Sequence, residues 1–146
     1  MTPKHYLMTA MRLAIKYKRA LEDVEQIREL ATSAGAIRYD KLNVQQSPDG
    51  DRLADYMDRL TKAEERSIRL SEQYYAAYTK IRDQIDEIQP EIYGDILHAR
   101  YIRGLKLWQI ADEMGYSYDR MRHLHGMALT AFGRHFPEAL KDSRGA

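Results

Sequence analysis

The residues best able to bind a ligand by charge lie in the last third of the sequence. Between residues 96 and 136, six Lys and Arg side chains stand against three acids, a local charge of +3 in a chain of net charge +1. Such a mildly basic segment permits binding to a polyanion but does not demand it. The basic residues are Arg100, Arg103, Lys106, Arg120, Arg122 and Arg134, joined by His98, His123, His125 and His135.

Metal-binding and catalytic chemistry find little support in the residue pattern. His123 and His125 are two residues apart, a spacing that puts them on different faces of a helix. The chain has no cysteine, which excludes disulfides, thiolate metal ligands and a thiol nucleophile. Acidic pairs such as Glu64 and Glu65 are adjacent and also diverge, and no glycine-rich phosphate loop, GxSxG or HExxH motif occurs. We therefore expect no catalytic residue, no metal site, no cofactor and no enzyme activity.

The most informative stretch is residues 110–117, Ile-Ala-Asp-Glu-Met-Gly-Tyr-Ser. Gly115 stands where a left-handed residue would end a helix, and Ser117 is a natural N-cap for the next one. Ala111 is small, as a close helix crossing requires. The pattern predicts a helix-turn-helix whose second helix packs through Met121, Leu124, Ala128 and Leu129. Its exposed first turns would then carry the candidate DNA-binding residues Ser117, Tyr118, Asp119, Arg120, Arg122 and His123.

This module resembles region four of bacterial sigma factors over about 40 residues. In that family an LRY-x-x-G helix precedes an IA-x-x-hG-hS turn (h, hydrophobic) and a recognition helix ending in AL. Here the corresponding runs are residues 100–104 and 110–129. The resemblance implies that Tyr118, Asp119, Arg122 and His123 contact bases or phosphates of double-stranded DNA. Tyr118, His123 and Trp108 depart from the residues usual in that family, so no base preference carries over.

The whole chain resembles small phage and prophage proteins that include ArpU-type late-gene transcriptional regulators. The shared layout is a Tyr6-Leu7 start, a long helix, a VQxSP-x-x-D link at residues 44–51, a second helix and a region-four-like end. This resemblance implies a transcriptional regulator that acts in the cytoplasm of a bacterial host. RNA polymerase is then a candidate second partner.

Two long helices are expected to precede the module. Thr2-Pro3 predicts a helix start, and apolar residues at helical spacing (Leu7, Met11, Ala14, Tyr17, Leu21 and Val24) predict a helix to about Ala31. Residues 51–89 form the second, with a stripe of Leu53, Met57, Leu60, Tyr74, Tyr78, Ile81, Ile85 and Ile88 that weakens where Glu64, Ser67 and Ser71 intervene. Since neither narrow stripe stabilises a lone helix, we expect a coiled-coil-like antiparallel hairpin or pairing with a second chain.

The expected architecture is therefore all-α. Residues 1–89 would be the helical hairpin, with a connecting loop at 32–50 and an extended piece near 37–44, and residues 90–146 the helix-turn-helix module. Gly35, Pro48 and Gly50 are the turn signals in that loop. A composition of 44% hydrophobic and 31% charged residues is typical of a folded protein. No apolar run of about 18 residues occurs, and charged residues interrupt the N-terminal segment where a signal peptide would be apolar. No membrane partner is expected.

Three functions fit these features. A transcriptional regulator is the first, and because so modest a charge binds DNA weakly, a homodimer through the hairpin is expected. The second is a DNA-packaging factor resembling a small terminase subunit, which also joins a helix-turn-helix to an oligomerising helical part. The third is a structural helical adaptor that does not bind DNA.

Overall fold

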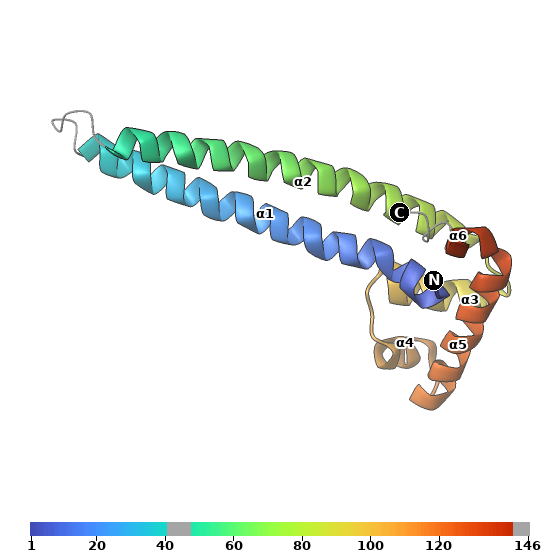
Figure 1. Ribbon diagram of the computed structural model, residues 1–146. Helices are drawn as coiled ribbons and strands as arrows, with labels where there is room; N and C mark the ends of the chain where they lie inside the picture. The colour runs from blue at the N-terminus through green and yellow to red at the C-terminus, as the bar shows by residue number, and fades with distance from the viewer. Residues whose placement is uncertain (41–47, 142–146) are drawn as a thin grey trace. The chain divides into compact units, whose positions relative to one another are not determined.

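The computed structural model describes the backbone of residues 1–40 and 48–141 and the side chains of residues 1–33 and 51–141. Every regular element in these ranges is a helix, which confirms the all-α prediction (Figure 1). The α-helices are α1 (Pro3–Asp40), α2 (Pro48–Asp86), α3 (Glu91–Leu97), α4 (Leu107–Met114), α5 (Tyr118–His135) and α6 (Pro137–Lys141), and a π-helical segment, η1 (His98–Ile102), follows α3. No helix of the described ranges is long and apolar enough to cross a membrane.

The predicted loop at 32–50 is too long. Helix α1 continues to Asp40 and α2 already begins at Pro48, so residues 37–40 of the expected extended piece are helical. Residues 41–47, the rest of that loop, lie outside the described residues. Ala31, Ala34 and Ala36 are strong helix formers, and the cost of about 1 kcal/mol for Gly35 is too small to end the helix among them. Pro48 fits the first position of a helix, where its missing N–H costs nothing.

The chain divides into two compact units, and the division falls inside the long helices. Met1–Leu13 and Tyr74–Ala146 form one, which we call the terminal unit, and Ala14–Gln73 form the other, the hairpin unit. This division differs from the predicted boundary between residues 89 and 90. The first turns of α1 and the last turns of α2 belong with the shorter helices because their apolar residues share a core with α5.

In the hairpin unit, α1 and α2 lie antiparallel, as predicted (Figure 1). The ion pair between Arg28 Nη2 and Glu64 Oε1, at 3.1 Å, joins the two helices. The buried seam is made of small side chains together with Val24: Ala20, Ala31, Ala63 and Ser67. The Ser67 hydroxyl donates to the Glu64 carbonyl at 2.8 Å, so the polar residue in the weakened part of the stripe is buried without an unpaired donor.

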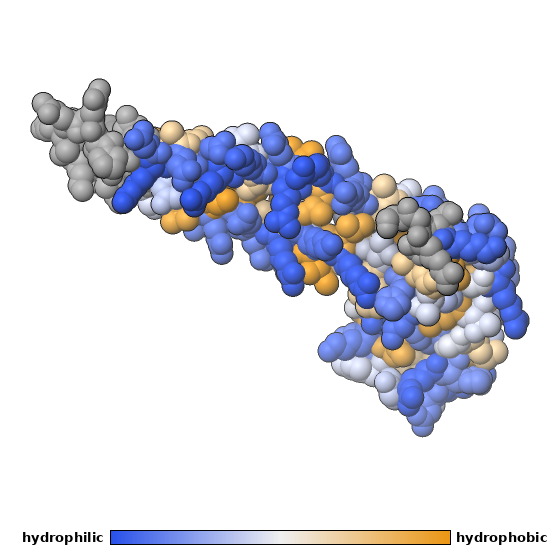
Figure 2. Space-filling model, viewed as in Figure 1, coloured by the Kyte–Doolittle hydropathy of each residue, from blue (hydrophilic) through white to orange (hydrophobic). Residues whose placement is uncertain are grey.

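Two residues that the sequence pattern assigned to the buried stripes of the hairpin are exposed. Leu21 is 43% exposed and Met57 48% exposed, whereas Ala20 is buried. Because Ala20, Val24 and Ala31 follow the spacing of four and seven residues, Leu21 is rotated about 100° away from the seam. Figure 2 shows hydrophilic side chains over much of the visible face of this hairpin, with hydrophobic ones between them. Exposed Ile15, Leu30 and Ile68 belong to the apolar part of its surface.

In the terminal unit, the ends of α1 and α2 pack on the middle of α5. One buried cluster joins the start of α1 and the end of α2 to α5. Its members are Leu7, Ala10, Ile81, Ile85, Ile88, Leu97, Tyr101, Ala128 and Phe132. Tyr6 at the edge of this cluster donates its hydroxyl to Gln84 Oε1 at 2.6 Å. A second cluster, Ile96, Ala99, Ile110, Ala111, Met121 and Leu124, lies between α3, η1, α4 and the start of α5. Residues from both ends of the chain thus hold α5.

Leu7→Ala should lower the free energy of unfolding by about 2–5 kcal/mol, because it empties a fully buried position in the core that supports α5. Leu21→Ala is the matched control in the same helix and should change it by about 0.5 kcal/mol or less, since Leu21 is 43% exposed. Urea denaturation followed by circular dichroism measures both. Equal effects of the two substitutions would contradict the placement of α1 in this core.

Candidate nucleic-acid interface

The turn between α4 and α5 is closed by two backbone hydrogen bonds. Gly115 has φ +74° and ends α4 in the left-handed conformation, as predicted. Its N–H donates to the Asp112 carbonyl at 3.4 Å, and the Tyr116 N–H donates to the Ala111 carbonyl at 2.9 Å. This pair of bonds is the Schellman motif, which satisfies carbonyls that a helix end leaves unpaired.

Ser117 begins α5 as its N-cap, also as predicted. Its backbone is extended, and its Oγ accepts the Arg120 N–H at 3.1 Å. Asp119 lies in the first turn, where a carboxylate is favourable beside the positive end of the helix dipole. Only three residues therefore separate two well-terminated helices, which fixes the direction in which α5 leaves α4.

The predicted inner face of α5 is confirmed. Met121 and Ala128 are fully buried, Leu124 is 5% exposed, and Leu129 is half-buried. Met121 and Leu124 contact the cluster that contains Ile110 and Ala111 of α4. With this face buried, the opposite side of the first turns of α5 must face solvent.

The six predicted DNA-binding residues are all exposed. Arg122 lies close to two of the others: its guanidinium carbon is 5.8 Å from the centre of the Tyr118 ring, and its Nη1 is 3.9 Å from Asp119 Oδ1. The side chains of Arg122 and Asp119 are 63% and 95% exposed, so this contact is loose and can give way to a ligand. The structure thus brings Tyr118, Asp119 and Arg122 together, and Arg120 and His123 are exposed beside them.

A groove of about 510 Å³ continues the basic surface along α5. Arg122 and His123 line it with Met127 and Arg134 of the same helix and Tyr93 of α3. The Tyr93 hydroxyl contacts Met127 Sδ at 3.8 Å, so two of these lining side chains touch each other. Arg134 was not among the predicted site residues. Its separation of 11 residues from His123, about three helical turns, is the signal that could have placed it on this face.

His125 faces the opposite way from His123. It is buried, and its Nε2 is 2.9 Å from the Tyr101 hydroxyl. Burial, then the charges of Arg100 and Lys4, lower the pKa of His125 to about 4, and burial raises the pKa of Tyr101 to about 12. Both groups are therefore neutral near pH 7, and His125 supplies a hydrogen bond to the core, with no charge for a polyanion.

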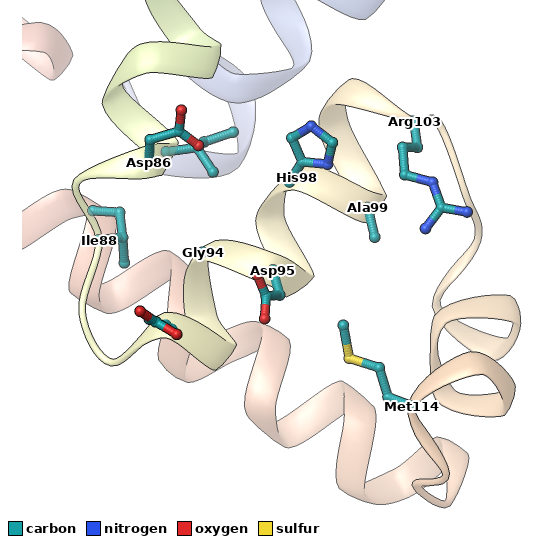
Figure 3. Close-up of a pocket in the computed structure, with 10 residues that line it drawn as sticks. Asp86, Ile88, Gly94, Asp95, His98, Ala99, Arg103 and Met114 are labelled. Carbon is teal, nitrogen blue, oxygen red and sulfur yellow. The ribbon is translucent and has the colours of Figure 1, made fainter.

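Another surface of the terminal unit carries the opposite charge. A pocket of about 560 Å³ is lined by the carboxylates of Asp86, Glu91 and Asp95 together with His98 and Arg103 (Figure 3). Arg103 does not contribute to a basic face as the sequence count assumed. Its guanidinium donates two hydrogen bonds to Glu113, at 2.9 and 3.0 Å, and these bonds lower the pKa of the Glu113 carboxyl. This surface would repel phosphates.

In the part of the chain that the structure describes, no three His, Asp or Glu side chains gather closely enough to hold a metal ion. This holds for the acidic pocket of Asp86, Glu91 and Asp95 as well. The basic groove along α5 is therefore the stronger candidate for ligand binding, because it joins exposed cations to a helix of fixed orientation.

Gly115→Ala should lower the free energy of unfolding by about 1–2 kcal/mol, the cost of holding an L-residue in the left-handed conformation. A Cβ at this position would meet no atom within 4 Å, so the loss would be conformational and not steric. Gly126→Ala is the matched control: it also has open space, but it lies inside α5 without a positive φ. It should raise the free energy of unfolding by about 0.5–1 kcal/mol. Losses of similar size at both positions would contradict the turn geometry.

Stability should also fall in mild acid. Because the pKa of His125 is about 4 in the fold and 6.5 in an exposed histidine, the unfolded chain takes up a proton between these values that the folded chain does not. The contribution of neutral His125 to the free energy of unfolding is fully present above pH 6.5. It decreases by on the order of 2–3 kcal/mol as the pH falls towards 4. His125→Gln should flatten this part of the stability profile in denaturant titrations at several pH values. A ring of His125 that titrates near 6.5 in NMR spectra of the folded protein would show that the histidine is not buried in this way.

Comparison with known proteins adds no relative. No protein-family model, no curated protein and no solved structure matches this chain. The resemblance to region four of sigma factors and to ArpU-type regulators accordingly remains a prediction from the residues that carry it.

Proposed function

We propose that this protein is a phage-type transcriptional regulator that binds duplex DNA through α4 and α5 and has no enzymatic activity. The observation that carries the proposal is the turn itself. Gly115 and Ser117 fix α5 on α4, and the helix presents Arg120, Arg122 and His123 to solvent at its first turns. In a helix-turn-helix, these turns of the second helix contact base edges in the major groove.

The dimensions and chemistry of α5 support this proposal. An α-helix with its side chains is about 10–12 Å across, and the major groove is about 12 Å wide. Arg122 offers a planar pair of donors suited to the two acceptors of guanine, and the carboxylate of Asp119 can accept from the amino group of cytosine. Arg134, which lines the same groove farther along α5, is suited to a phosphate contact.

The modest charge of the terminal unit favours two copies on one DNA site. Few phosphate contacts give weak binding at physiological salt, and a dimer doubles them while matching two half-sites. The hairpin unit offers an apolar surface for this pairing: Met57 and Ile68, both exposed, lie 11 residues apart on one face of α2. RNA polymerase is a further partner in this proposal, and a bacterial cytoplasm is its location.

The double variant Arg122→Ala, His123→Ala should bind duplex DNA at least about tenfold more weakly, because each lost base contact costs about 1–3 kcal/mol. Fluorescence anisotropy across a salt series, with duplex fragments from the DNA around the coding sequence, measures the affinity. Arg66→Ala removes the same single charge at pH 7 from an exposed position of the hairpin unit and should bind like the parent. An unchanged affinity and salt slope in the first variant would remove α5 from the interface.

The mass of the protein in solution separates this function from the other two. A dimer by light scattering supports a regulator, and a ring of eight or more copies favours DNA packaging. A chain that retains no duplex DNA at low salt would be a structural adaptor.

A further inference from the structure

A smaller pocket lies beside the start of α5, and of the six residues predicted from the sequence only Tyr118 lines it. Its volume is about 310 Å³. It collects three cations from three separate elements: Lys4 from the first turn of α1, Arg100 from η1, and Lys106 at the start of α4. Among the described residues that line it, none is acidic.

The fold fixes the backbone at Lys4 and the guanidinium of Arg100. Leu7, one turn after Lys4, is fully buried, and Pro3 packs so closely on α5 that a Cβ at Gly133 would lie 3.0 Å from its ring. Arg100 is half-buried and donates one hydrogen bond, at 3.4 Å, to the Leu105 carbonyl, with its guanidinium carbon 5.6 Å from the centre of the Tyr101 ring. A guanidinium has five N–H donors, so the others can serve a ligand.

His125 lies beside two of these cations. It lines this pocket, and burial, then the charges of Arg100 and Lys4, lower its pKa. The ring is therefore neutral near pH 7 and adds no charge of its own to the pocket. The first turn of α4, with the positive end of its dipole, opens onto the same pocket through Lys106 and Trp108.

The pocket is continuous with the start of the proposed recognition helix. Tyr118, the first residue of α5, lines it and is 51% exposed, and its ring is near Arg122, which faces the groove on the other side. Trp108 is 53% exposed at the rim. A ligand bound in this pocket would therefore lie next to the ligand that contacts the first turns of α5.

We propose that Lys4, Arg100 and Lys106 form a phosphate-binding pocket that holds the backbone of the duplex next to the bases contacted by α5. This inference rests on the proposed function and extends it, since it makes the N-terminal turn of α1 part of the DNA-binding surface. Arg100 supplies a fixed pair of donors for phosphate oxygens, and the two lysines add charge from either side. A phosphate of the duplex is favoured over a small free anion because the pocket is open beside α5 and has aromatic residues at its rim.

The test is duplex binding by the full chain over a salt series, with Lys4→Ala, Lys106→Ala as the variant. Each lost phosphate contact should make the slope of log K against log salt shallower by about 0.9, and should weaken binding roughly eightfold near 0.1 M salt. Lys16→Ala, Lys18→Ala removes the same charge from exposed positions of α1 in the hairpin unit and should leave both quantities at the parent values. Lys4→Arg, Lys106→Arg should restore most of the slope.

Trp108 provides a direct readout because it is the only tryptophan in the sequence. Its emission should change as duplex binds and should not saturate with inorganic phosphate at the same concentration of phosphate groups. Saturation by inorganic phosphate, with no competition from duplex, would overturn the proposal in favour of a small-anion site.

The remaining outcomes separate the two proposals. If Arg122→Ala, His123→Ala weakens duplex binding but the lysine variant keeps the parent slope and the Trp108 emission is unchanged, the pocket proposal is wrong and the regulator proposal stands. If the parent itself binds no duplex at low salt, both fail together.

Discussion

The direction of α5 depends on the burial of Ala128 and Phe132 against side chains from both ends of the chain. Leu7 and Ile85 are separated by most of the two long helices in sequence, yet both contribute to the core on which α5 lies. The second cluster, through Met121 and Leu124, fixes the start of the same helix on α4. An exposed face with a defined orientation follows from these two burials, since a helix held at its first turns and at its middle cannot rotate about its axis.

Features governed by neighbours in sequence could be predicted, and those governed by packing could not. Gly115, Ser117 and the inner face of α5 follow from backbone conformation, capping and helical spacing, all of which are local. The ion pair of Arg103 with Glu113 joins residues ten apart across a turn, and it depends on how η1 packs on α4. Leu21 shows the same limit: its hydrophobicity suggested the seam, but the packing of α1 on α2 buries Ala20 and leaves Leu21 exposed.

Net charge describes this protein poorly because its charges are sorted onto different surfaces of the terminal unit. Carboxylates gather in the pocket of Asp86, Glu91 and Asp95, whereas Arg122 and Arg134 line the groove along α5. The Glu113 carboxylate neutralises the charge of the Arg103 guanidinium. A local field near the start of α5 can therefore attract a polyanion although the chain as a whole is almost neutral.

The π-helical segment η1 is, in effect, an α-helix that has taken in one extra residue. The Arg103 N–H donates to the carbonyl of His98, five residues back, at 3.0 Å. This wide turn lets Tyr101 reach His125 in the core while Arg100, its neighbour, lines the basic pocket. Because the wide turn absorbs the extra residue, the side chains before and after it keep the phase of a regular helix. Loss of one residue here is therefore expected to leave the rest of the helix in register and to displace chiefly the side chains of η1 itself, Arg100 and Tyr101 among them.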